Sequence, residues 1–120
     1  MTTALVGLGG LIGVLGRYGV TRLTLHTDAL LWSTVGINVV GSFLLGVLAA
    51  EHWFSRDVRE AIGVGLLGGF TTFSSFSVES LVMLQRGQFL LALGHTLAHV
   101  MGALACAAVG FRLAQAVLLR

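Results

Sequence analysis

Residues 68–79 read GGFTTFSSFSVE, and the predicted fold depends on this segment more than on any other. A glycine pair precedes five hydroxyl side chains within seven residues, inside an otherwise apolar stretch. Serine and threonine hydroxyls satisfy backbone groups that are released where a membrane helix unwinds, so the pattern indicates a broken helix. The alternative is a continuous helix whose hydroxyls bond back to the preceding turn. The sequence leaves both interpretations open.

The composition of the whole chain places this segment in a membrane. Of the 120 residues, 56% are hydrophobic and 10% are charged, and the mean hydropathy is +0.94. A soluble domain carries about 25% charged residues. The seven cations are all arginine and are scattered, whereas nucleic-acid sites need clustered charge. We therefore expect an all-α integral membrane protein that has no nucleic-acid partner and is not an enzyme.

The spacing of the charges predicts four transmembrane helices. Uncharged stretches cover residues 1–16, 29–50, 61–78 and 87–111, which are 16, 22, 18 and 25 residues long. About 20 helical residues cross a bilayer, whereas barrel strands would be short and alternating. Including Arg17 in the first span gives helices at about 3–25, 30–53, 58–84 and 88–118. Residues 1–120 are thus expected to form a single membrane domain.

The arginines give only a weak signal for orientation in the membrane. One side would hold Arg56, Arg59, Arg112 and Arg120, and the other would hold Arg22 and Arg86. An excess of four over two is small for the positive-inside rule. If the chain inserts both ways, two oppositely oriented copies would form an antiparallel homodimer. Insertion in one orientation fits the charges equally well.

Small residues predict close packing between helices. The chain has 17 glycines and no proline. The last span repeats a small residue at every fourth position, at Gly94, Ala98, Gly102, Cys106 and Gly110. Shorter repeats of this kind pair Gly9 with Gly13 and Gly65 with Gly69. In lipid such residues allow helix backbones to approach closely, and we interpret them as packing positions.

Three polar side chains stand within or beside the apolar spans. Asn38 lies at the centre of the second span, where its amide must face a neighbouring helix or a wet path. Arg17 is costly within the first span and would reach the interface, pair with Glu79 or attract anions. Interhelical hydrogen bonding is the simpler interpretation of Asn38.

Aromatic and histidine pairs add two further candidate features. Phe73 and Phe76 share a helical face, and the electropositive edges of their rings can face a small anion without trapping it. Lipid or core packing is the simpler interpretation of two such rings. His95 and His99 lie one turn apart as a possible metal pair, but no third ligand is apparent, so packing or pore lining is favoured.

Three segments together resemble the Fluc (CrcB) family of fluoride channels. Residues 9–18, GGLIGVLGRY, resemble its GGxxGxxxRY opening, and residues 37–46, INVVGSFLLG, resemble its VNxxGSFLLG motif. Residues 68–79 are similar to its most specific signature, GGFTTFSTFSxE. The fourth span departs from the family, because members often carry tyrosine and serine near the pore where this chain has His95, Thr96 and His99.

The resemblance implies an antiparallel, dual-topology homodimer in the lipid bilayer, with two fluoride pores and a structural sodium ion at its centre. It assigns the fluoride pore to aromatic, amide and hydroxyl side chains, namely Phe73, Phe76, Asn38, Thr72, Ser74, Ser75 and Ser77. It places sodium on the backbone carbonyls of Gly68 and Thr71, Arg17 in a vestibule, and Glu79 at the end of the signature.

The function implied is passive, selective export of fluoride from the cytoplasm across the cell inner (plasma) membrane. Two alternatives have the same size and span count. A small multidrug exporter would need a carboxylate in its first helix, where this chain has Arg17. A subunit with no transport role would leave Asn38 and the hydroxyl run without a purpose.

Overall fold

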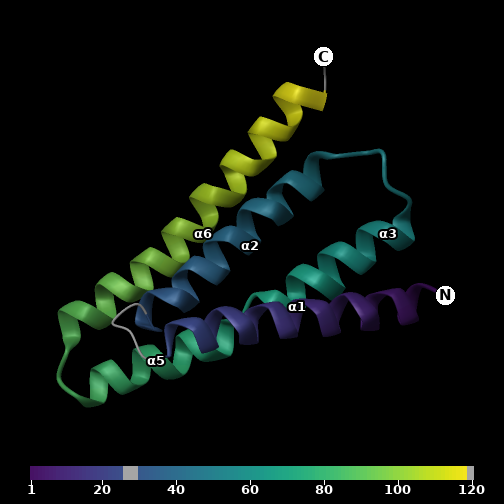
Figure 1. Ribbon diagram of the computed structural model, residues 1–120. Coiled ribbons are helices and arrows are strands. Elements are labelled where there is room, and N and C mark those ends of the chain that lie inside the picture. Colours follow the sequence, from purple (N-terminus) through teal and green to yellow (C-terminus); the bar gives the residue numbers. More distant parts are fainter. Residues whose placement is uncertain (26–29, 119–120) are drawn as a thin grey trace.

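The computed structural model describes residues 1–25 and 30–118, which form helices joined by loops (Figure 1). The helices are α1 (Thr2–Thr24), α2 (Leu30–Ala50), α3 (Arg56–Glu60), the π-helical segment η1 (Ala61–Leu67), α4 (Gly68–Phe70), α5 (Phe73–Gln85) and α6 (Phe89–Leu118). Segments α3, η1 and α4 follow one another directly, and α5 begins after a two-residue interruption.

Four helical segments are long and apolar enough to cross a membrane, namely Thr2–Thr24, Trp32–Ala50, Arg56–Gln85 and Phe89–Val117. The all-helical, four-span membrane architecture is therefore confirmed. The third span is the broken one, since Thr71 and Thr72 both have extended backbones.

The second helix ends at Ala50, three residues before the predicted end at position 53. Glu51 accounts for the difference, because its Oε2 accepts hydrogen bonds from the amides of Trp53 and Phe54, at 2.9 and 3.1 Å. Arg59 donates from Nη1 to the Glu51 carbonyl at 2.8 Å. These bonds satisfy the chain in a turned conformation that competes with a further helical turn.

Gly87 ends α5 with a tight turn into α6. Its φ of 72° is left-handed, and its amide donates to Leu84 while the amide of Gln88 donates to Met83. This is the Schellman arrangement, which satisfies the last carbonyls of a helix and favours glycine.

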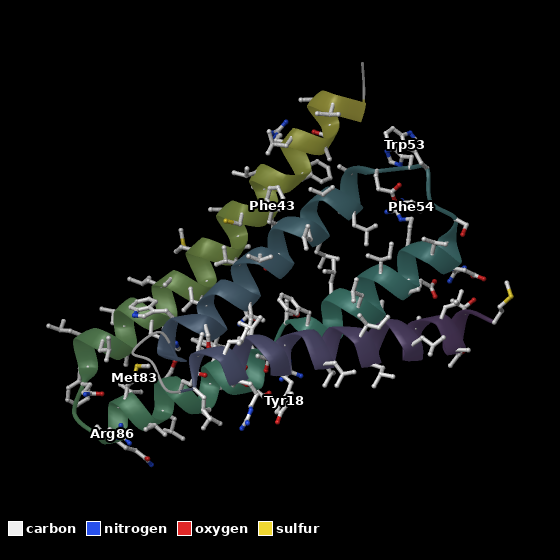
Figure 2. The ribbon with its side chains drawn as sticks, viewed as in Figure 1. Tyr18, Phe43, Trp53, Phe54, Met83 and Arg86 are labelled. Atoms are coloured by element: carbon white, nitrogen blue, oxygen red, sulfur yellow. The ribbon has the colours of Figure 1, made fainter. Side chains whose placement is uncertain are left out.

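The N-terminus and the last turn of α6 lie at the same end of the molecule as the loop between α2 and α3 (Figure 1). Trp53 and Phe54 mark this end, and Met83 and Arg86 lie at the opposite end (Figure 2). Arg120, which the charge count placed with the termini, lies outside the described residues.

Helix α1 packs closely on the broken helix through glycines (Figure 1). A Cβ at Gly13 would overlap the carbonyl oxygen of Leu66, and one at Gly69 would lie 2.7 Å from that of Gly10. Gly9 and Gly65 meet backbone atoms in the same way. The two short glycine repeats are therefore the contact between these helices.

Helix α2 runs beside α6 and uses the small residues of α6 unevenly (Figure 1). Gly110 lies against the carbonyl of Phe43, and a Cβ at Gly102 would be 3.2 Å from a Val39 methyl group. Gly94 has nothing within 4 Å. Only part of the predicted stripe of small residues therefore packs against other helices of the same chain.

Candidate functional site

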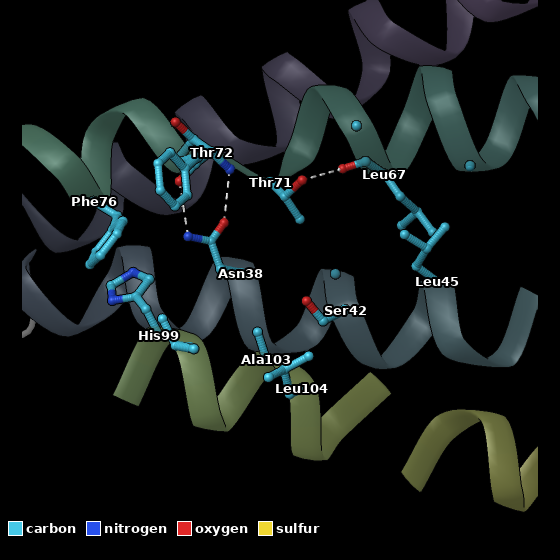
Figure 3. Close-up of a pocket in the computed structure, with 15 residues that line it drawn as sticks. Asn38, Ser42, Leu45, Leu67, Thr71, Thr72, Phe76, His99, Ala103 and Leu104 are labelled. Carbon is cyan, nitrogen blue, oxygen red and sulfur yellow. Dashed lines mark hydrogen bonds between the residues drawn. The ribbon is translucent and has the colours of Figure 1, made fainter. Parts of the chain in front are cut away.

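Asn38 holds the broken helix open. Its Nδ2 donates to the carbonyl of Thr72 at 2.9 Å, and its Oδ1 accepts from the amide of Thr72 at 2.8 Å (Figure 3). The side-chain amide of Asn38 on α2 thus takes the place of the helical hydrogen-bond partners of Thr72. It binds both the carbonyl and the amide of that residue, as a residue on a neighbouring strand would. Of the two interpretations of the hydroxyl run, the structure shows the break.

Backbone carbonyls lose their usual helical partners at the break. In an unbroken helix the amide of Thr72 would bond to Gly68, but it binds Asn38. The amide of Ser75 would bond to Thr71, but it donates to the Thr72 hydroxyl at 3.3 Å. The carbonyl of Gly69 accepts from Arg17 Nε at 3.1 Å. The carbonyls of Gly68 and Thr71 are therefore among those released from the helical ladder.

The predicted hydroxyls divide into a cluster and one separate member. Thr72 Oγ1 lies 3.2 Å from Ser74 Oγ and donates to Ser75 Oγ at 3.1 Å. Thr72 also caps α5, because its hydroxyl accepts the amide of Ser75. Ser77 is exposed and bonds back to the Phe73 carbonyl at 2.9 Å, as in an ordinary helix.

The two phenylalanines meet edge to face. Their ring centroids are 5.2 Å apart with an interplanar angle of 62°. Phe76 is 8% exposed, whereas Phe73 is 76% exposed on the protomer. One ring is thus part of the interior, and the other stands at the edge of the single chain.

A cavity of about 410 Å³ joins these features (Figure 3). It lies between α2, the broken helix and α6. Six of the predicted site residues line it, namely Asn38, Gly68, Thr71, Thr72, Phe73 and Phe76. No Arg, Asp or Glu side chain is among its 15 lining residues in the described part of the chain.

Two polar lining residues were not assigned to the site from the sequence. Ser42 lies one turn after Asn38 on α2, and this i, i+4 spacing is the signal that would have indicated it. His99 lies on α6 and is 5% exposed. Its signal was a histidine in a membrane-spanning helix, where ionisable residues are costly.

Arg17 and Glu79 bind different partners, so the pairing considered from the sequence is not formed. Arg17 bonds to the Gly69 carbonyl. Glu79 Oε1 accepts from the Thr34 hydroxyl at 2.6 Å, and its Oε2 lies 3.3 Å from His95 Nε2. Glu79 therefore belongs to a polar cluster between α2, α5 and α6, outside the cavity lining.

The histidine pair is buried between helices. The ring centroids of His95 and His99 are 4.4 Å apart, and His95 Nδ1 lies 3.1 Å from the Ser80 hydroxyl. Within residues 1–25 and 30–118, no three His, Cys, Asp or Glu side chains gather in a way that would hold a metal ion. The pair packs against Phe76, as the simpler interpretation predicted.

Comparison with known proteins assigns the family. Residues 4–111 match the family model described as CrcB-like protein, Camphor Resistance (CrcB). A protein of Thermus thermophilus named "Fluoride-specific ion channel FluC" is 42% identical over 117 residues, covering 93% of this chain and 94% of that one. Proteins of the same name from Novosphingobium aromaticivorans and Francisella philomiragia are 43% and 39% identical, covering 83% and 89% of this chain and 88% and 89% of theirs. This chain therefore belongs to the CrcB family.

Proposed function

We propose that this protein is a fluoride-selective channel that lets fluoride leave the cytoplasm passively through the plasma (inner) membrane. The observation that carries the proposal is the cavity at the Asn38-supported break, which brings an amide, two phenyl rings and released backbone groups together in a membrane-spanning fold. Membership of a family whose relatives are named fluoride-specific channels supports the choice of ion.

The chemistry of the cavity suits an anion that must pass through it. The Asn38 amide nitrogen has a second hydrogen that its bond to Thr72 does not use. The edges of Phe73 and Phe76 offer partial positive charge, and the Thr72 hydroxyl cluster offers hydrogen bonds. Because no arginine lines the cavity in the described part, weak contacts replace water without holding the ion tightly.

The working unit in this proposal is an antiparallel, dual-topology homodimer with two pores. Phe73 lines the cavity and yet is 76% exposed on the protomer, so a second copy at this edge would complete the enclosure. The arginines support either orientation, with Arg56, Arg59 and Arg112 at one end and Arg22 and Arg86 at the other. Each copy would supply one cavity.

A sodium ion at the dimer centre is the final part of the proposal. The carbonyls of Gly68 and Thr71 fit a cation, because the amides that would bond to them in a continuous helix bind side chains instead. Two carbonyls from each copy would hold the ion. Its charge would stabilise carbonyl dipoles that converge on the break.

Fluoride efflux from liposomes tests the function. We expect protein-containing liposomes to release fluoride quickly and to retain chloride, as measured with ion-selective electrodes. Replacing Phe73 and Phe76 together by isoleucine keeps apolar bulk but removes the ring edges, so fluoride release should fall at least tenfold. A subunit with no transport role would show no release before or after this change, and equal chloride release would exclude fluoride selectivity.

A further inference from the structure

A second cavity, of about 550 Å³, lies between the end of α2 and the last turns of α6, and we refer to it as the α2–α6 groove. Its walls are mostly small and apolar, and they include Gly46, Ala49, Ala107 and Ala108. Ala49 and Ala108 are exposed, so the groove is open to the surroundings of the single chain. Both helices are long and apolar enough to cross a membrane, and those surroundings are therefore lipid or another membrane chain.

Two polar side chains stand at the end of the groove where the helices end. Arg112 and Gln115 lie three residues apart on α6, so they share a face of the helix, and both line the groove. Within residues 1–25 and 30–118, neither side chain has a hydrogen-bond or ion-pair partner. Both are therefore available to a ligand.

The other described arginines at this end of the molecule already have carboxylate partners. Arg56 Nε lies 2.8 Å from a carboxylate oxygen of Glu60. Arg59 Nε lies 3.7 Å from a carboxylate oxygen of Glu51, and its Nη1 donates to the carbonyl of the same residue. In the described part of the chain, Arg112 is thus the cation at this end whose charge is not balanced by a neighbour.

The groove runs from the membrane surface toward the membrane interior. The fourth span is 29 residues long, whereas about 20 residues cross the hydrocarbon core, so its last turns reach the headgroup region. Trp53 follows the end of α2 at the same end of the molecule and is 74% exposed, and tryptophan favours the headgroup level (Figure 2). Arg112 therefore lies near the headgroups, while Ser42 and Leu45 line the deeper part of the groove.

This arrangement matches the chemistry of a phospholipid. A guanidinium binds two oxygens of a phosphate at once, and the Gln115 amide can donate a further hydrogen bond. From Ala107 to Gln115 the helix rises about 12 Å, so the apolar walls can cover part of one acyl chain. A small hydrated anion would use Arg112 but would gain nothing from those walls.

We propose that the α2–α6 groove binds an anionic phospholipid, whose phosphate contacts Arg112 and Gln115 and whose acyl chain lies between α2 and α6. A negatively charged headgroup is favoured over a neutral one because the charge of Arg112 is unbalanced, and a basic residue at the membrane surface attracts anionic lipids. This site is independent of the proposed channel function, since lipid binding is measured without transport.

Native mass spectrometry of the full chain in detergent micelles tests the headgroup contact. Phosphatidylglycerol and phosphatidylcholine with the same acyl chains are added in equal amounts, and the share of protein that retains each lipid is measured. The wild-type protein should retain phosphatidylglycerol preferentially. Arg112→Gln should lower this retention about fivefold, which is the effect of one basic residue on an anionic lipid, and Arg112→Lys should keep most of it.

Arg86→Gln is the matched control for charge, because Arg86 is exposed at the opposite end of the molecule and lines neither cavity. It removes the same charge and should leave the retention of phosphatidylglycerol unchanged. Equal losses in the Arg112→Gln and Arg86→Gln variants would show a general charge effect and overturn the site. Equal retention of the two lipids by the wild-type protein would also overturn it.

Filling the groove tests the acyl-chain contact while Arg112 stays in place. Ala108→Leu adds bulk at an exposed wall of the groove and should lower the retention of phosphatidylglycerol. Ala105→Leu, at an exposed position outside both cavities, is the control and should not lower it. Unchanged retention in Ala108→Leu would refute an acyl chain in the groove.

The same spectra distinguish the other possible occupants. A smaller share of dimers in Ala108→Leu, with lipid retention unchanged, would assign the groove to a second copy of the chain and overturn the proposal. Inorganic phosphate that displaces phosphatidylglycerol more than chloride does at the same ionic strength would make Arg112 a site for free anions and would overturn it as well.

Discussion

Replacing Asn38 by leucine tests the central claim that one side chain holds the third helix open. Leucine is close in size but removes both hydrogen bonds, which measure 2.8 and 2.9 Å and end on the backbone of Thr72. Thr72 is only 9% exposed, so water does not readily replace the lost partner. The amide and the carbonyl of Thr72 are both left without the Asn38 bonds.

Two estimates bracket the loss of folding stability expected for Asn38→Leu. A buried polar group left unsatisfied costs about 1–3 kcal/mol, which gives about 2–6 kcal/mol for two groups. Interhelical side-chain bonds in membranes contribute about 0.6 kcal/mol each on average, or about 1.2 kcal/mol for two. The estimate for unsatisfied buried groups applies better, because the two groups that lose their partners are backbone atoms at a helix break. We expect a loss of about 2–4 kcal/mol and of fluoride efflux.

The assay is reversible unfolding in mixed micelles, with fluoride efflux measured on the same preparations. Ser42→Ala is the control, since Ser42 lies one turn away on α2 and lines the same cavity. Asn38→Asp keeps an oxygen for the Thr72 amide, but when ionised it loses the donor and adds a costly charge within the span, so it should also be destabilised and pass little fluoride. A loss below about 1 kcal/mol with efflux unchanged in Asn38→Leu would refute the reasoning.

Three further outcomes follow from the structure. Gly13→Ala places a Cβ against the Leu66 carbonyl and should cost about 1–3 kcal/mol, whereas Gly7→Ala meets nothing within 4 Å and should not destabilise the protein in the same unfolding assay. Thr72→Val removes the cap of α5 and should slow efflux, while Ser77→Ala removes only a bond back to the preceding turn and should leave the rate unchanged. Replacing sodium by a large organic cation during purification should lower the thermal stability of the proposed dimer, and an unchanged melting temperature would contradict the proposed ion.

The sequence predicted the membrane spans well because they depend on local composition. Long runs without charge form helices in lipid, because a helix satisfies its backbone groups within its own segment. The misplaced end of α2 shows the limit of this reasoning. Glu51 turns the chain by accepting the amides of Trp53 and Phe54, and charge spacing does not encode that bond.

Part of the candidate site was also predictable, because it too depends on local composition. The glycine pair and hydroxyl run marked the break, and Asn38 was recognised as a polar group that needed a partner. That Asn38 binds Thr72, 34 residues away, depends on how α2 lies against the broken helix. A pairing of Arg17 with Glu79 was one of three possibilities that the sequence offered, but the packing gives each a different partner.

The sequence by itself determined a four-span helical membrane protein and made an interrupted third helix one of two interpretations, because hydropathy, glycine and hydroxyl content act within a few residues of their own position. The tertiary structure alone decided which polar groups share a cavity. His99 illustrates this, since its burial and its place beside Phe76 follow from the packing of α6 against α2 and α5. Such relations join residues that are distant in the chain, and the spacing of residues along one helix carries no information about them.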